Sequence, residues 1–120
     1  MKAHGFVVAF LGLFLFLSGC THRFSLSLEK GEPVKVTTLG ADISHTFQPG
    51  TDGYQKLAGW LAKNQSGWNR YFATPPAQGR TVGLAAHYQL QFLDSTVILH
   101  TPDGLWIKSA APSDSPFLAQ

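Results

Sequence analysis

The chain has 120 residues, with nine Lys and Arg against seven Asp and Glu, and 44% of its residues are hydrophobic. Charges this nearly balanced, with no cluster of lysines or arginines, exclude the basic stripe of a nucleic-acid-binding surface. The length is that of one domain, and a single cysteine excludes an internal disulfide.

The first 19 residues have the three zones of a secretory signal peptide. Residues 1–4 carry one positively charged side chain, residues 5–17 are all apolar, and the small residues Ser18 and Gly19 follow. A helix that spans a bilayer needs about 20 apolar residues. Since the apolar segment is shorter than that, it predicts a cleaved signal peptide, residues 1–19.

The end of the signal carries a more specific motif. Leu17, Ser18, Gly19 and Cys20 read leucine, small, small, cysteine, which resembles the lipobox of bacterial lipoproteins. The resemblance implies that the Cys20 thiol receives a diacylglyceryl group, that the signal is removed, and that the new amine of Cys20 is acylated. Two or more acyl chains anchor a protein firmly, whereas one binds reversibly. The alternative is an ordinary secretory signal followed by a chance cysteine.

The residue after Cys20 bears on localisation. It is Thr21 and not aspartate, which by the same resemblance implies sorting to the outer membrane of a Gram-negative bacterium. Residues 20–23 would then form a lipidated tether about 10 Å long when extended. We expect so short a tether to keep the following domain, residues 24–111, close to the membrane.

The first half of this domain combines strands with one helix. Residues 24–29 and 34–39 alternate apolar and polar side chains around a turn, which predicts a β-hairpin. Residues 43–47 predict either a third strand or an extended lead into the helix. Leu57, Trp60 and Leu61 then recur at helical spacing after the possible N-caps at 51–52, which predicts a helix with one apolar stripe.

The second half is predicted to be mostly strand. Residues 68–79 should be irregular, because two adjacent prolines remove backbone donors. Residues 88–92, 96–100 and 105–108 predict a three-strand antiparallel meander joined by turns, and residues 112–120 predict a flexible tail. The expected fold class is α+β, with an antiparallel sheet of hairpin and meander and one helix packed on one face.

Catalytic and metal-binding motifs are missing from the sequence. The elbow pattern of serine hydrolases, the P-loop and the dinucleotide-binding glycine pattern do not occur. The histidines that follow Cys20 lack the close spacing of zinc ligands; they are His22, His45, His87 and His100. We therefore expect neither an enzyme nor a cofactor or metal site, with a small periplasmic enzyme as the least favoured alternative.

Aromatic residues gather after the predicted helix. Trp60 should be core, and Trp68, Arg70, Tyr71 and Phe72 follow within twelve residues. Trp, Tyr and Arg are enriched at binding hot spots, so Trp68, Arg70, Tyr71 and Phe72 are the predicted partner-binding residues. The competing interpretation is that Trp68 and Phe72 fold back over the sheet and close its core.

These observations predict a lipid-anchored envelope protein that binds a protein partner, as a toxin-immunity protein or an accessory of an envelope complex. A structural or cell-wall-associated lipoprotein is the alternative. The pattern of Trp60, Asn64, Gly67-Trp68 and residues 74–76 before a late meander resembles small uncharacterised domains of Gram-negative envelope proteins. That resemblance implies no functional residue for this chain.

Overall fold

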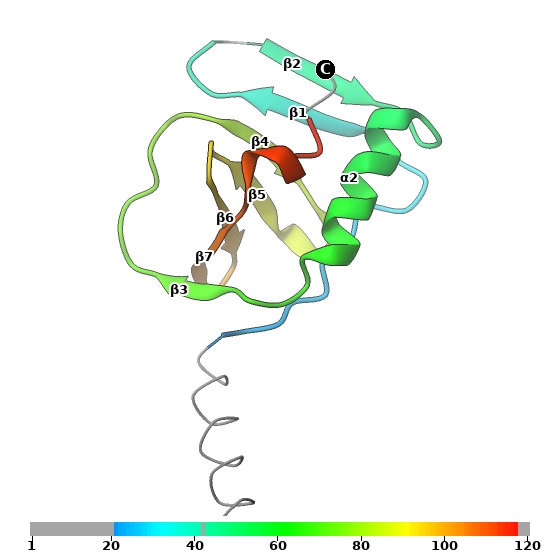
Figure 1. Cartoon of the computed structure of the whole chain (residues 1–120). Coiled ribbons are helices and arrows are strands. Elements are labelled where there is room, and N and C mark those ends of the chain that lie inside the picture. The colour runs from blue at the N-terminus through cyan, green and yellow to red at the C-terminus, as the bar shows by residue number, and fades with distance from the viewer. Residues whose placement is uncertain (1–20, 42, 118–120) are drawn as a thin grey trace, which may run out of the picture.

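The computed structural model describes residues 21–41 and 43–117; the predicted signal peptide and Cys20 lie outside these residues. Seven strands form one antiparallel sheet in the order β2-β1-β4-β5-β6-β7-β3, and helix α2 lies beside it (Figure 1). The fold is therefore α+β, as predicted. The elements are β1 (Val34–Thr38), β2 (Ile43–Phe47), α2 (Asp52–Lys63), β3 (Asn69–Tyr71), β4 (Arg80–Gly83), η1 (Ala85–His87), β5 (Gln89–Phe92), β6 (Thr96–Thr101), β7 (Gly104–Ser109) and η2 (Pro112–Asp114).

The predicted hairpin of residues 24–29 and 34–39 is wrong. Strand β1 pairs instead with β2, which confirms residues 43–47 as a strand, and on its other side with β4. Residues 24–29 form no strand and pair with no strand of the sheet. Their alternation does correspond to one buried face, since Leu26 is buried and its two neighbours are exposed. The hydrogen bonds that a pairing strand would make to Leu26 are made by a side chain instead.

That side chain is Gln65. The Leu26 N–H donates to Gln65 Oε1 at 2.8 Å, and Gln65 Nε2 donates to the Leu26 carbonyl at 2.9 Å. The carboxamide offers N–H donors on its nitrogen and an acceptor on its oxygen, so it satisfies both backbone groups of Leu26 as a neighbouring strand would. Phe24 N–H and the Gln65 carbonyl add a backbone hydrogen bond of 2.7 Å, which fixes the segment along the end of α2.

Helix α2 agrees with its prediction. Leu57, Trp60 and Leu61 are its buried residues, and the N-cap is Thr51. At the other end two side-chain amides satisfy carbonyls that a helix terminus leaves free: Asn64 Nδ2 donates to the Trp60 carbonyl and Gln65 Nε2 to that of Leu61. Among the described residues, none of the helices has the length and apolar character to cross a membrane.

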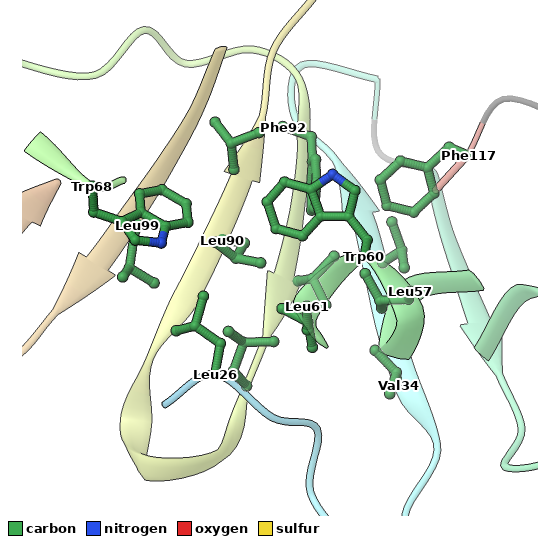
Figure 2. Close-up of a cluster of buried hydrophobic side chains, with 14 residues drawn as sticks. Leu26, Val34, Leu57, Trp60, Leu61, Trp68, Leu90, Phe92, Leu99 and Phe117 are labelled. Carbon is green, nitrogen blue, oxygen red and sulfur yellow. The ribbon is translucent and has the colours of Figure 1, made fainter. Parts of the chain in front are cut away.

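The core lies between α2 and one face of the sheet (Figure 2). The Trp60 ring from the helix meets Phe92 of β5 with centroids 4.9 Å apart and a tilt of 69°, an edge-to-face arrangement that aromatic quadrupoles favour. Buried residues from β1, β4, β5 and β6 complete the layer; they are Val34, Val36, Val82, Leu90, Val97 and Leu99.

The meander of β5, β6 and β7 is confirmed, but two further strands were missed. Residues 69–71, predicted to be irregular, form β3 and pair with β7. Residues 80–83 form β4 between β1 and β5. The prolines at 75–76 do forbid a strand locally, yet each of these short strands lies outside their reach and is stabilised by a partner distant in sequence.

Both ends of the described chain pack against the domain. Within the predicted flexible tail, residues 112–120, the described part includes η2 and Phe117, which is buried and meets Phe92 edge-on with ring centroids 5.0 Å apart. Within the predicted tether, residues 20–23, His22 forms an isolated antiparallel bridge with Trp68. The fold thus begins two residues after Cys20.

Candidate functional site

The candidate functional site lies at the β3 edge of the sheet. Cross-strand partners share a face of an antiparallel sheet, and one row runs outward from Leu99 through Trp106 to Arg70. Leu99 is fully buried, Trp106 is half-buried and Arg70 is exposed. The apolar row therefore ends in a cation stacked on an indole, with Arg70 Cζ 5.0 Å from the Trp106 ring centroid.

Two further contacts hold the guanidinium of Arg70 in place. Its Nη2 donates to the Asp103 carbonyl at 3.0 Å, and the Phe72 ring lies 5.9 Å from its Cζ. Gly104 supplies the necessary room: its φ is +142°, and a Cβ there would lie 2.5 Å from Arg70 Nη2. The turn between β6 and β7 thus forms part of the site.

Phe72 is the most exposed large hydrophobic residue of the described chain, at 87%. It follows the last residue of β3 and has only the Arg70 contact among the ring interactions found. Burying a phenylalanine side chain is worth about 1.5–3 kcal/mol. A phenylalanine left in water beside a fixed arginine is available for contact with something outside the domain.

Two rings from the start of the described chain complete the site. The His22 ring lies 4.8 Å from the Trp106 ring and 4.6 Å from that of Phe24, which meets Trp106 at 5.1 Å. We call the surface of Arg70, Phe72, Trp106, His22 and Phe24 the Arg70 patch. The Trp106 indole N–H is buried without a hydrogen-bond partner among the described residues.

Trp68 does not belong to this surface, so the prediction of a partner contact there is wrong. Its side chain is fully buried, its Nε1 donates to the Asn64 carbonyl at 2.8 Å, and it packs against Trp60 with ring centroids 6.5 Å apart. The competing interpretation, that Trp68 closes the core, is the correct one. Phe72, in contrast, does not fold back over the sheet.

Tyr71 lies apart from Arg70 as well. Its cross-strand partner is Leu105, whereas that of Arg70 is Trp106, and successive residues of a strand face opposite sides. Tyr71 is half-buried on the side away from α2. Of the four predicted binding residues, only Arg70 and Phe72 therefore share one exposed surface.

Sequence reasoning missed Trp106, His22 and Gly104 as parts of the site. Trp106 was assigned to a strand, and His22 to a tether, without a link to residues 68–72. The link depends on the pairing of β3 with β7 and on the bridge between His22 and Trp68. The available signal was Trp106, a tryptophan close to the Pro102-Asp103-Gly104 turn. This signal does not reveal which strand pairs with the strand of Trp106.

The opposite face of the sheet holds a polar cluster that fixes the loop before β4. Gln91 is 2% exposed, and its Nε2 donates to the carbonyls of Pro76 and Gln78. Both amide hydrogens being used, Gln91 Oε1 accepts from His100 Nε2 at 3.1 Å, so this nitrogen carries the hydrogen. Burial lowers the pKa of His100, because a charged imidazole loses hydration there.

Lys108 of β7 contacts the residues between α2 and β3. Its Nζ donates to the Ser66 carbonyl at 2.6 Å and lies 6.0 Å from the Trp68 ring centroid. Burial lowers its pKa, again because the charged form loses hydration. The side chain thus ties β7 to the residues that follow α2.

Ionisable groups do not gather elsewhere in the part of the chain that the structure describes. In residues 21–41 and 43–117, no three His, Cys, Asp or Glu side chains lie close enough together to hold a metal ion. A cavity of about 600 Å³ contains Arg80, Asp94 and Phe117 in its lining. Arg80 lies 4.9 Å from the Phe117 ring centroid, a contact that helps to hold the C-terminal segment.

Comparisons with known proteins were made for the whole chain. No family model matches it, and no significant match was found among the curated proteins or the solved structures.

Proposed function

We propose that this chain is a bacterial lipoprotein, anchored through acyl chains on Cys20 in the outer membrane of a Gram-negative cell envelope, whose domain binds a protein partner. The observation that carries the anchor is the lipobox, Leu17-Ser18-Gly19-Cys20, at the end of a short apolar segment. A fold that begins at His22 is consistent with a lipid at Cys20, because it leaves the domain complete after removal of residues 1–19.

Replacing the acceptor thiol tests the anchor. The full chain and its Cys20→Ser variant are expressed in a Gram-negative host, with Ser25→Ala, an exposed serine of the domain, as matched control. Intact-mass measurement should show that the wild type and the control exceed the polypeptide from residue 20 by the mass of the acyl groups. The variant should lack that excess, and density-gradient fractionation should place the wild type in outer membranes. An unchanged mass for Cys20→Ser contradicts the anchor.

The protein partner is supported by exposed hydrophobic side chains at both edges of the sheet. Phe72 follows β3, and Ile43, 50% exposed, begins β2. The sequence favoured the first of these surfaces through Trp68, Arg70, Tyr71 and Phe72, of which Arg70 and Phe72 are exposed. Fixed arginine and aromatic side chains are residue types that carry binding energy at interfaces.

Cross-linking in intact envelopes, followed by purification in detergent, tests this second part. We expect a defined envelope protein to copurify with the wild type. Arg70→Ala/Phe72→Ala and Ile43→Ala are compared, because each removes one exposed surface without touching Trp68. Loss with only one variant assigns the partner to that edge. Absence of any cross-linked protein contradicts a protein partner and leaves the anchor standing.

A further inference from the structure

We infer that the Arg70 patch rests on the phospholipid headgroups of the membrane that holds Cys20, as a second, non-covalent contact that orients the domain. This inference rests on the proposed lipidation of Cys20 and names the occupant of one surface. With lipid at this patch, the protein partner of the proposed function binds at the β2 edge, where Ile43 is exposed; a protein bound at the Arg70 patch is the competing occupant.

The first argument is the length of chain between the anchor and the fold. His22 N–H donates to the Trp68 carbonyl at 2.7 Å, and Trp68 N–H donates to the His22 carbonyl at 3.2 Å. These two bonds fix His22 to the residue before β3. Two residues of extended chain span about 7 Å, so a lipid on Cys20 brings the bilayer surface to this end of the domain.

The patch is at that end. The His22 ring packs against Trp106 at 4.8 Å, and Arg70 stacks on the same indole at 5.0 Å. Figure 1 shows β3 near the segment where the described chain begins, with β1 and β2 at the other end of the molecule. Because His22 and Arg70 contact the same Trp106 ring, the patch lies close to a lipid attached at Cys20. The effective concentration of membrane lipid at the patch is therefore high.

The second argument is charge. Within residues 21–41 and 43–117, the single ion pair joins Lys56 and Asp52. The guanidinium of Arg70 is held by a carbonyl and two rings, and no carboxylate of the described residues pairs with it. Arg23, next to His22, is also exposed. Phosphate groups of lipids complement such cations with charge-assisted hydrogen bonds.

The third argument is the chemical type of the exposed groups. Phe72 extends beyond Arg70 with 87% of its surface in water, and Trp106 lies half-buried behind it. Aromatic rings with arginines are typical of the membrane–water boundary, where the ring enters the apolar side and the cation stays among the headgroups. One patch therefore supplies both halves of an interfacial contact.

A spin label near Phe72 tests the inference in the lipidated full-length protein. If Cys20 is acylated, an introduced cysteine is the only free thiol. Ala73→Cys places a label beside Phe72, and Ser44→Cys places a matched label on β2; both positions are exposed. Each protein is reconstituted in vesicles of phosphatidylethanolamine and phosphatidylglycerol, and label accessibility to oxygen and to a water-soluble nickel complex is measured.

We expect the label at 73 to be protected from nickel and accessible to oxygen, whereas the label at 44 behaves as in water. Arg70→Glu/Phe72→Ser, combined with Ala73→Cys, should raise nickel accessibility at least about threefold while the protein still floats with the vesicles. Equal nickel accessibility at 73 and 44 in the unaltered patch overturns the inference. Protection at 73 in native envelopes but not in pure lipid vesicles also overturns it, in favour of a protein occupant.

Failure of the anchor gives a different result from failure of the docking. Without acylation, the wild-type thiol of Cys20 takes up the label. In contrast, the acylated protein could float with the vesicles while its label at 73 remains accessible to nickel. That result would support the proposed anchor and refute the contact of the patch with lipid.

Discussion

Trp68 and Phe72 lie four residues apart, yet the first is fully buried and the second is 87% exposed. Both side chains lie on the face of the sheet that α2 covers. Trp68 lies beneath the end of the helix, where the Asn64 carbonyl accepts a hydrogen bond from its indole N–H. Phe72 follows the last residue of β3, beyond the cover of the helix. As aromatic residues of one short segment, both were predicted to bind a partner. Their positions relative to α2 make Trp68 a core residue and Phe72 a surface residue.

Substitution should separate these roles. Trp68→Ala removes a buried indole and should lower the free energy of unfolding by about 3–5 kcal/mol. Arg70→Ala and Phe72→Ala should each change it by no more than about 0.5 kcal/mol, as is usual for surface positions. Urea titration of the three variants measures this. A loss above about 2 kcal/mol for Phe72→Ala would show that its ring packs in the core.

His100 should make stability depend on pH. Burial lowers its pKa in the folded state, whereas the unfolded chain has the ordinary value of about 6.5. Above that value both states are neutral and stability is fully present. As the pH falls below about 6.5, the unfolded state takes up the proton first and the free energy of unfolding decreases, until the pH passes the lowered pKa and the decrease stops.

Denaturation between pH 8 and pH 4.5 measures this dependence. His100→Gln should flatten the part of the profile just below pH 6.5, and His45→Gln, at an exposed edge position, serves as the matched control. A profile unchanged by His100→Gln would remove His100 as the source of the dependence.

At the scale of elements, the position of the segment around Leu26 depends on the side chain of Gln65, which follows α2. Gln65→Ala removes both hydrogen bonds to Leu26 and the one to the Leu61 carbonyl, and it should cost about 3 kcal/mol, at about 1 kcal/mol per bond. Amide hydrogen exchange at Leu26 should accelerate more than that in β5 and β6. Gln55→Ala changes an exposed glutamine of α2 and should leave Leu26 protected. Equal protection in both variants would mean that Leu26 is held by its packing alone.

The C-terminal segment should contribute to stability through Phe117. Phe117 is 6% exposed and contacts Phe92 and Arg80, so Phe117→Ala should destabilise the fold by about 3 kcal/mol. Ser113→Ala, at an exposed position of η2, should be nearly neutral. Thermal denaturation compares the two. Equal melting temperatures would support the flexible tail that the sequence predicted.

At the scale of the whole molecule, one core joins both ends of the described chain to α2 and to the central strands of the sheet. Leu26 precedes the sheet, Leu57 and Trp60 come from α2, Leu90 and Leu99 come from central strands, and all belong to one buried cluster. Phe117 joins the same cluster from the C-terminal end. A single core in a domain of this size favours all-or-none unfolding.

We therefore expect one cooperative transition for this domain. Far-UV circular dichroism and tryptophan fluorescence should give coincident urea curves, because the backbone of the sheet and the rings of Trp60 and Trp68 lose their order together. The same coincidence should persist at lower midpoint in Phe117→Ala. Separate transitions for the two signals would show that the sheet and the helix layer unfold independently.

Local patterns in the sequence determined the elements whose partners lie nearby. The helical spacing of Leu57, Trp60 and Leu61 predicted α2 and its buried face, and short turns predicted the meander of β5, β6 and β7. The sequence likewise predicted contacts at Trp68, Arg70, Tyr71 and Phe72, because Trp, Tyr and Arg are enriched at binding hot spots, and two of these residues, Arg70 and Phe72, are exposed on one surface. Both inferences needed only residues close together in the chain.

Tertiary structure decided everything that depends on a distant partner. Alternation at residues 24–29 indicates one buried face but not whether a strand or Gln65 satisfies the backbone, and it gave the wrong hairpin. The three residues of β3 are too few to show a period, so their pairing with β7, the burial of Trp68 and the contact of Arg70 with Trp106 could not be predicted. Burial and pairing are properties of residues brought together from far apart in the chain, and no local pattern records which residues those are.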